Sequence, residues 1–125
     1  MRLLLDTHVA LWWLNNPAEL HESARDAIAD GANEVAVSAA SVWEVAIKAT
    51  AGRLDIPTPF LAALKKAELA ELPITWAHSH RVARLPGHHR DPFDRILIAQ
   101  ALEDGLVLVT RDPAIREYRV ATLAA

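Results

Sequence analysis

Two short stretches of uninterrupted apolar residues constrain the fold of this chain more than any other feature. Residues 3–5 read Leu-Leu-Leu, and residues 106–109 read Leu-Val-Leu-Val. A strand with one face in water alternates apolar and polar residues, whereas a strand of a parallel sheet covered on both faces is apolar throughout. We therefore expect both stretches to be buried strands of a parallel sheet.

Further strand and helix patterns alternate along the chain. Residues 34–38 and 72–75 predict two more short strands, and a last strand is expected near residues 119–123. Helical patterns fill the intervals at residues 9–14, 21–30, 39–51, 60–71 and 76–85, and from Asp91-Pro92 to Gly105. Strands that alternate with helices in this way predict βαβ units, and so an α/β fold with helices on both sides of a parallel sheet.

Composition excludes several classes of protein. Of the 125 residues, 52% are hydrophobic and 23% are charged, which is typical of a folded domain with a real core. The chain has no cysteine, so disulfides, thiolate catalysis and cysteine-bound zinc are excluded. No apolar run in the sequence is long enough to cross a bilayer, and we expect no signal peptide at its start. We expect a cytoplasmic protein.

The distribution of charge is uneven. The formal net charge of −3 does not by itself indicate a nucleic-acid-binding protein. However, residues 77–90 contain no acid, and their basic side chains are Arg81, Arg84, Arg90, His78, His80, His88 and His89. Such a segment is suited to phosphate, with histidine tuning the contact near neutral pH. The alternative is a solvated helix face followed by a loop.

Four acids are expected to meet at one edge of the sheet. Asp6 and Asp112 directly follow predicted strands, and Glu44 and Asp94 lie near the beginnings of predicted helices. In an open parallel sheet, ligands gather at the carboxyl ends of the strands, where the following helices also begin. The four carboxylates can therefore converge from four separate segments.

Most of these acids also have a structural explanation. Asp91 and Asp112 each precede a proline and fit helix N-caps, which would make Asp94 an acid of the first helical turn. Ser41 and Glu44 fit a Ser-x-x-Glu capping box, and Glu44 is also placed to pair with Lys48. Asp6 is the exception, because a capping role does not account for an acid at the end of so buried a strand.

The chemistry that the four carboxylates can perform depends on whether they lie close together. Carboxylates within a few ångströms repel one another unless some are protonated or a cation is shared. Oxygen ligands, without cysteine or a His-x₃-His pair, favour Mg²⁺ or Mn²⁺ over zinc. Such a cation lowers the pKa of bound water and offsets charge on a phosphoryl group under attack.

Four segments of the chain resemble the PIN-domain nucleases in the order that this family shows. They are Leu-Leu-Leu-Asp-Thr-His at 3–8, Ser-Val-Trp-Glu-Val-Ala-Ile-Lys at 41–48, Asp-Pro-Phe-Asp-Arg-Ile-Leu-Ile-Ala-Gln-Ala at 91–101 and Leu-Val-Thr-Arg-Asp at 108–112. The resemblance covers nearly the whole chain and is closest to the VapC toxins of toxin–antitoxin pairs. It implies a single PIN domain over residues 1–125, with a three-layer α/β/α fold and a central, mostly parallel sheet of four to five short strands.

The resemblance also implies a function and a site. It implies an endoribonuclease that uses Mg²⁺ or Mn²⁺ and cleaves phosphodiesters by in-line attack of metal-activated water, leaving a 5′-phosphate and a 3′-hydroxyl. Asp6 and Asp94 would be the main metal ligands, and Glu44 and Asp112 would complete the acidic pocket or orient the water.

Accessory residues and partners follow from the same resemblance. Thr110 matches a hydroxyl near the metal, while Asp91 is mainly an N-cap, with metal or substrate contact as the alternative. Independently of the resemblance, the basic segment makes Arg81, Arg84 and Arg90 candidate RNA contacts, and Arg111 is a further candidate. A cognate antitoxin and a homodimer are the implied protein partners. Of the four tryptophans, at least two should be core and one or two should line a partner groove.

Two other functions are compatible with the acids. In a receiver- or phosphatase-like phosphoacceptor domain, Asp6 would be the nucleophile, but such sites need a lysine at a strand end, and Lys48, Lys65 and Lys66 all lie in predicted helices. A catalytically inactive PIN-like binding module would be expected to lack one or two of the four acids, and all four are present.

Overall fold

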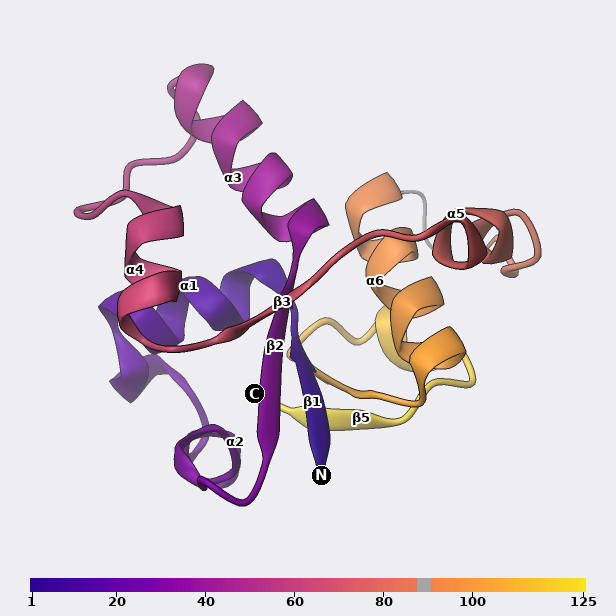
Figure 1. Cartoon of the computed structure of the whole chain (residues 1–125), viewed down its shortest axis with the longest axis horizontal. Coiled ribbons are helices and arrows are strands. Elements are labelled where there is room, and N and C mark those ends of the chain that lie inside the picture. The colour runs from indigo at the N-terminus through magenta and orange to yellow at the C-terminus, as the bar shows by residue number, and fades with distance from the viewer. Residues whose placement is uncertain (88–90) are drawn as a thin grey trace.

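The computed structural model describes residues 1–87 and 91–125, and it places a five-stranded parallel sheet between two layers of helices (Figure 1). The strands are β1 (Arg2–Leu5), β2 (Glu34–Ser38), β3 (Ala70–Leu72), β4 (Val107–Thr110) and β5 (Thr122–Ala124). Their order across the sheet is β3-β2-β1-β4-β5, and every adjacent pair is parallel. The predicted α/β fold with four to five strands is confirmed, with β1 at its centre.

Within the described residues, six α-helices connect the strands. They are α1 (Thr7–Asn15), α2 (Glu22–Ala29), α3 (Ala39–Thr50), α4 (Phe60–Lys66), α5 (Trp76–Val82) and α6 (Pro92–Asp104), with short 3₁₀ turns at Pro17–Glu19 and Ile115–Glu117. None of the helices in the described ranges is both long and apolar enough to cross a membrane. α6 ends at Gly105, whose positive φ of 66° closes the helix in the left-handed conformation that glycine adopts at little cost.

Alternation along β1 explains why its residues are apolar on both faces. Leu3 and Leu5 pack into a core cluster built mainly with α1, α2 and α4, whereas Leu4 packs into a second cluster with α6 and β4. All three leucines are fully buried. Helices therefore cover both faces of the sheet, and this arrangement produces the continuous apolar run seen in the sequence.

Two predicted boundaries in the middle of the chain are wrong. The helix expected at residues 60–71 ends at Lys66, where Glu68 takes a positive φ of 58° that a helix cannot continue through. The strand expected at residues 72–75 lies earlier, at Ala70–Leu72, and stops before Pro73. Proline has no N–H to donate to a sheet ladder, so the strand ends ahead of it.

The N-terminus of α3 also differs from the prediction. Ser38 caps the helix, because its hydroxyl accepts from the Ala40 N–H at 3.0 Å. A capping box formed by Ser41 and Glu44 is therefore wrong: both residues lie inside the helix, with their side chains buried. Capping by an earlier serine leaves both side chains available for contacts with α1.

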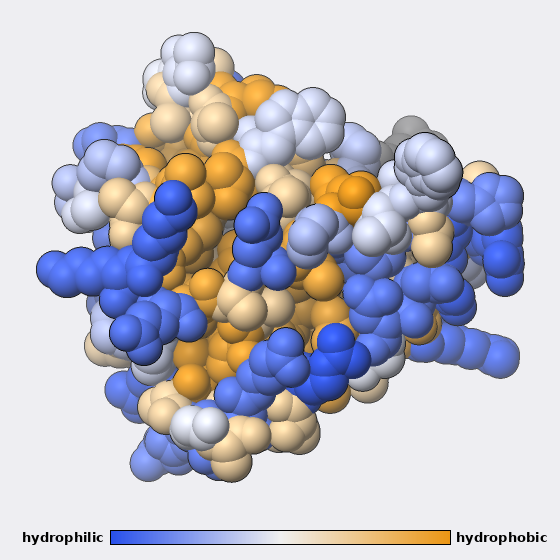
Figure 2. All heavy atoms as spheres, in the orientation of Figure 1, coloured by the Kyte–Doolittle hydropathy of each residue, from blue (hydrophilic) through white to orange (hydrophobic). Residues whose placement is uncertain are grey.

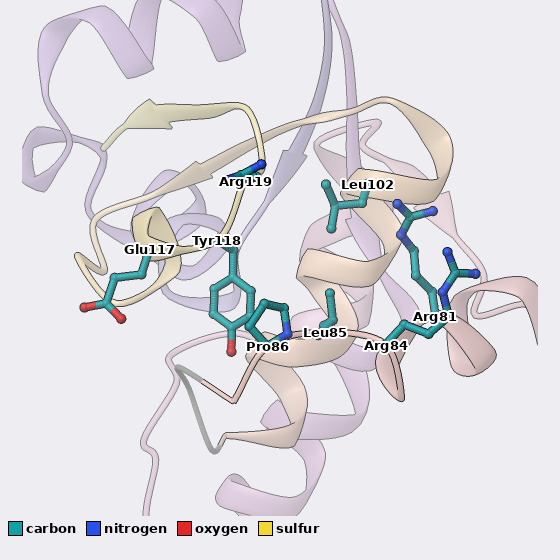
Figure 3. A pocket seen from close by; sticks show the side chains of 8 residues that line it. All are labelled: Arg81, Arg84, Leu85, Pro86, Leu102, Glu117, Tyr118 and Arg119. Carbon is teal, nitrogen blue, oxygen red and sulfur yellow. The ribbon is translucent and has the colours of Figure 1, made fainter.

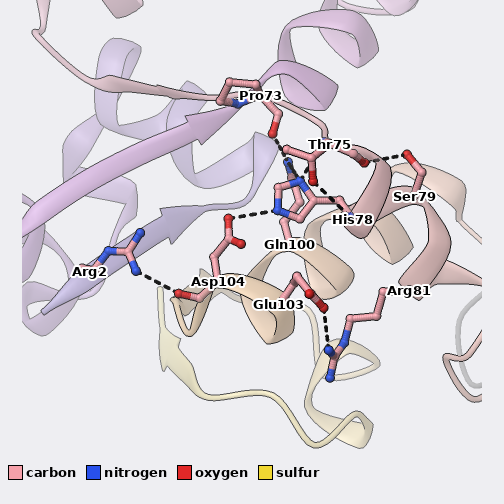
Figure 4. A network of polar contacts seen from close by, with 9 residues as sticks. All are labelled: Arg2, Pro73, Thr75, His78, Ser79, Arg81, Gln100, Glu103 and Asp104. Carbon is pink, nitrogen blue, oxygen red and sulfur yellow. Dashed lines mark hydrogen bonds and ion pairs between the residues drawn. The ribbon is translucent and has the colours of Figure 1, made fainter.

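A buried polar network joins α5 to α6 (Figure 4). His78 is only 2% exposed, and its Nδ1 accepts from the Thr75 N–H at 3.0 Å, completing a capping box at the start of α5. Its Nε2 lies 2.9 Å from Asp104 Oδ2. An accepting Nδ1 requires the proton on Nε2, which then donates to Asp104. His78 is thus a structural residue, and the prediction that it tunes a phosphate contact is wrong.

Replacement of His78 should destabilise the protein. His78→Ala removes the donor to Asp104, leaves the Thr75 N–H unpaired and opens a cavity, so we expect a loss of about 2–4 kcal/mol in the free energy of unfolding, measured with urea. His80→Ala, on the exposed side of the same helix, is the control and should change stability by less than about 0.5 kcal/mol. Equal unfolding midpoints for the two variants would contradict the assignment.

Candidate active site

Asp6 lies where the central strand passes into a helix. Its backbone N–H donates to the Val109 carbonyl at 3.1 Å, which continues the pairing of β1 with β4 by one residue. Its Oδ1 accepts from the Val9 N–H at 2.9 Å and caps α1. The expectation that no capping role accounts for Asp6 is therefore wrong, because the acid belongs to the helix that follows the strand as well as to the strand end.

The other oxygen of Asp6 is bonded to the neighbouring strand. Thr110, the last residue of β4, donates from Oγ1 to Asp6 Oδ2 at 2.6 Å. Thr110 Oγ1 in turn accepts from the Asp112 N–H at 3.1 Å, and the Asp112 carboxylate accepts from the Ala114 N–H at 2.9 Å. The ends of β1 and β4 thus bring Asp6, Thr110 and Asp112 into one hydrogen-bonded series.

Burial perturbs the ionisation of Asp6. The side chain is 7% exposed, and loss of hydration raises the pKa of Asp6 above its ordinary value. The hydrogen bonds from Thr110 and Val9 and the side chain of His8 lower that pKa, and the negative charge of Asp112 raises it. The carboxyl is therefore held where its charged form is costly, which is typical of acids at functional sites.

Glu44 is held next to the same strand end. It is 4% exposed, on the second turn of α3, and its Oε1 accepts from the Thr7 hydroxyl at 2.7 Å. Its Oε2 lies 2.6 Å from Lys48 Nζ, which confirms the predicted pairing of these two residues. Both carboxylate oxygens are thereby fixed, and Thr7, the neighbour of Asp6 in the sequence, links the two acids.

Sequence reasoning assigned no role to Thr7. This residue is buried and contacts two residues of α3, Ser41 Oγ at 2.8 Å and Glu44 Oε1. The available signal was its place directly after Asp6, at the start of a helix that faces α3.

Asp94 reaches the same edge on α6. The helix runs back along the sheet into β4, so its first turn lies at the edge where β4 ends. Asp91 caps α6, because its Oδ1 accepts from the N–H groups of Phe93 at 2.8 Å and Asp94 at 3.3 Å. The N-cap role predicted for Asp91 is confirmed. Asp94 is the third residue of the helix, as expected.

The acids do not form a closed metal-binding cage. Among residues 1–87 and 91–125, no group of three His, Asp or Glu side chains is placed to hold a metal ion. The side chains bonded in series instead supply carboxylate and hydroxyl oxygens, the donors that Mg²⁺ and Mn²⁺ prefer. The donor set suits a hard divalent cation, and metal ligation by Asp6, Asp94, Glu44 and Asp112 stays a prediction.

The predicted RNA contacts lie in different surroundings. Arg111 packs over the Trp12 ring at 4.3 Å and donates to the Ala125 carbonyl at 3.0 Å from Nε, so its guanidinium fastens the C-terminus to α1. Arg81 pairs with Glu103 at 2.7 Å, and Arg84 is exposed. Arg90, together with His88 and His89, lies outside the described residues. RNA contact by any of these arginines stays a prediction.

Two of the four tryptophans pack against the core, as expected, and contact of the other two with a partner stays a prediction. Trp12 and Trp13 pack against the core on α1. Trp43 is 61% exposed and Trp76 is 94% exposed. Trp43 meets Phe93 edge to face, with 5.2 Å between ring centroids. Because Trp43 precedes Glu44 and Phe93 precedes Asp94, this aromatic pair joins the two helices that carry these acids.

Comparison with known proteins places the chain in a family. Residues 3–121 match the PIN domain family. Over 122 residues the chain is 38% identical to ribonuclease VapC22 of Mycobacterium tuberculosis, a match that covers 94% of this chain and 92% of that relative.

Solved structures share the fold. A crystal structure of VapBC2 from Rickettsia felis, bound to a promoter DNA fragment, contains a chain that matches with a TM-score of 0.75 and 13% identity, covering 99% of this chain and 98% of that one. VapBC-5 of M. tuberculosis, from the VapBC family of toxin–antitoxin systems, matches with a TM-score of 0.65 and 22% identity, covering 98% and 96%. This chain belongs to the PIN-domain family, as a VapC-like member.

Proposed function

We propose that this protein is an endoribonuclease and the toxin of a toxin–antitoxin pair, folded as one PIN domain over residues 1–125 and acting in the cytoplasm. The observation that carries the proposal is the buried Asp6 carboxylate at the end of the central strand, bonded to Thr110 and joined through it to Asp112. The 38% identity to a protein named as a ribonuclease supports the same activity.

Mg²⁺ or Mn²⁺ is the cofactor that we propose. Asp6 and Asp94 would hold the ion, with Glu44 and Asp112 completing the acidic pocket. A bound divalent cation would neutralise charge at the phosphodiester and lower the pKa of the attacking water. A cation would also offset the cost of ionising Asp6, whose pKa is raised by burial and by the charge of Asp112.

The residues around the acids position them for this role. The Thr110 hydroxyl and the Val9 N–H fix both oxygens of Asp6, so the carboxylate keeps a single orientation. Thr7 and Lys48 do the same for Glu44. Such fixed orientation is the main contribution that a protein makes to phosphodiester cleavage, because the reaction needs the water and the leaving oxygen to be in line.

The reaction itself is a hydrolysis. The oxygen of a water molecule bonds to phosphorus, the bond from phosphorus to the 3′-oxygen breaks, and the products are a 5′-phosphate and a 3′-hydroxyl. In this proposal Glu44 and Asp112 orient the water, and the proton that it loses passes to the carboxylate cluster before reaching the leaving 3′-oxygen.

A cognate antitoxin and a second copy of the chain are the protein partners that we propose. Two structural neighbours are described as VapBC bound to DNA, and a third as a member of the VapBC family of toxin–antitoxin systems. Apolar side chains gather on the surface over α3 and α4 (Figure 2), where a groove of about 470 Å³ is lined by Val42, Leu61, Leu64 and Leu69. Leu61 is half exposed there, as expected for a surface that a partner covers.

The alternatives are less well supported. The phosphoacceptor hypothesis needs a lysine at a strand end, and Lys48 lies within α3, bound to Glu44. An inactive binding module would have no need of a buried acid with a raised pKa at the strand end.

Asp6→Asn tests the catalytic role. We expect RNA cleavage in Mg²⁺ to fall by about 100-fold or more, because the variant loses the anionic oxygen but keeps a carbonyl to cap α1. Asp26→Asn, at an exposed position on α2, is the matched control and should cleave like the parent chain. Activity of Asp6→Asn equal to that of the control would rule out the proposed site.

The raised pKa of Asp6 also predicts an effect on stability. Whereas the Asp6 carboxylate is expected to support activity, its ionised form is expected to destabilise the fold. In metal-free buffer the folded chain binds the Asp6 proton more tightly than the unfolded chain does, so this residue destabilises the fold increasingly as pH rises above about 4. Asp6→Asn removes that effect.

Urea unfolding with EDTA between about pH 4 and pH 8 checks this expectation. The stability of Asp6→Asn relative to the parent chain should rise with pH across the window above the ordinary aspartate pKa and then level off. A difference that is constant with pH, or that falls, would show that the pKa of Asp6 is not raised.

A further inference from the structure

An arginine-lined cavity lies on the flank of the molecule, away from the groove at α3 and α4. It has a volume of about 560 Å³ and is open to solvent between α5, α6 and the segment at residues 117–119 (Figure 3). Arg81 and Arg84 come from the α5 side, and Arg119 comes from the segment before β5. Leu85, Leu102 and Tyr118 line the cavity between them.

Positive charge in this cavity is only partly balanced. Arg81 pairs with Glu103, and Glu117, at the rim, is drawn in Figure 3 with its carboxylate directed away from Arg81 and Arg84. Within the described residues, Arg84 and Arg119 have no hydrogen bond or ion pair through their side chains, and both are exposed. Two unpaired guanidinium groups thus face one cavity in a chain whose net charge is −3.

The shape and chemistry of the cavity suit a phosphate that carries an organic group. Guanidinium groups present a planar fork of donors that matches phosphate oxygens. The partly buried apolar side chains of Leu85 and Leu102 offer a surface for a sugar or a base beside that phosphate. An isolated inorganic anion would leave this apolar lining unused.

Arg95 connects the cavity to the proposed active site. It directly follows Asp94 on α6, and its Nη1 donates to the Pro86 carbonyl at 2.7 Å and to the Tyr118 hydroxyl at 3.2 Å. Both acceptors belong to residues that line the cavity. The first turn of α6 therefore carries Asp94 at the acidic edge of the sheet. The next residue, Arg95, binds Pro86 and Tyr118 in the wall of the cavity.

We propose that this cavity binds a phosphodiester group of the RNA substrate outside the cleaved bond, held by Arg84 and Arg119. The proposal rests on the proposed ribonuclease function and adds a second, basic contact with the same strand. Within residues 77–90 the proposal assigns the RNA contact to Arg84. It adds Arg119, which is distant from Arg84 in the sequence.

Salt-dependent RNA binding tests the proposal in an Asp6→Asn background, in which cleavage is expected to be slower by about 100-fold or more. Three proteins are compared: the Asp6→Asn parent, the same parent with R84Q/R119Q, and the same parent with the charge-matched pair R53Q/K66Q. For each protein, the fluorescence anisotropy of labelled single-stranded RNA gives the Kd at several KCl concentrations. Arg53 and Lys66 are exposed and distant from the cavity lining. We expect R84Q/R119Q to raise Kd about tenfold and to reduce the slope of log K against log salt by roughly 0.7, the change for one phosphate that is no longer neutralised.

The control pair should leave Kd and slope close to those of the parent, and thermal unfolding of all three proteins should coincide. Equal effects of the two pairs would overturn the cavity proposal in favour of diffuse attraction. Unchanged binding by R84Q/R119Q would overturn it too. In either case RNA cleavage by the unsubstituted chain would leave the proposed function standing, whereas a parent that neither binds nor cleaves RNA would overturn both.

Discussion

The burial of one carboxylate between two parallel strands is the constraint on which the rest of this structure depends. Asp6 sits at the end of the central strand with both oxygens bonded, to the Val9 N–H at 2.9 Å and to the Thr110 hydroxyl at 2.6 Å. Hydrogen bonds to a charged group contribute about 1.5–3 kcal/mol each, yet burial still raises the pKa of Asp6. The fold therefore keeps an acid that destabilises it. Such an acid is expected where the binding of a substrate or a cation offsets the destabilisation.

Much of the fold could be predicted because its strands are buried on both faces. The runs at residues 3–5 and 106–109 have no polar residue to face water, so they required helices on both sides. The middle of the chain was harder to predict. Residues 60–71 look helical locally, but the left-handed Glu68 ends the pattern, and Ala70–Leu72 becomes a strand by pairing with β2. That pairing is a tertiary contact, which local propensity does not contain.

The edge of the sheet that carries the candidate site was predictable, because strand ends and helix beginnings share one edge of a parallel sheet. Metal ligation by the four acids stays a prediction. The supporting contacts of the site could not be predicted. Thr7 bonds to Glu44 across 37 positions of sequence, and Thr110 bonds to Asp6 across 104. The bond from Arg111 to the Ala125 carbonyl could not be foreseen, and Arg119, which lines a basic cavity, gave no sequence signal. Side-chain partners of this kind depend on packing that only the structure contains.

The central claim is that the acidic edge holds the divalent cation, and NMR with Mn²⁺ tests it most directly. Paramagnetic Mn²⁺ broadens amide signals close to its binding site, so titration into the ¹⁵N-labelled chain maps that site. The account predicts the strongest broadening around residues 6–9, 94 and 110–112, and its loss in Asp6→Asn. Broadening centred on other acids, such as Asp26 in α2 and Asp30 at the end of that helix, or broadening that persists unchanged in Asp6→Asn, would contradict it.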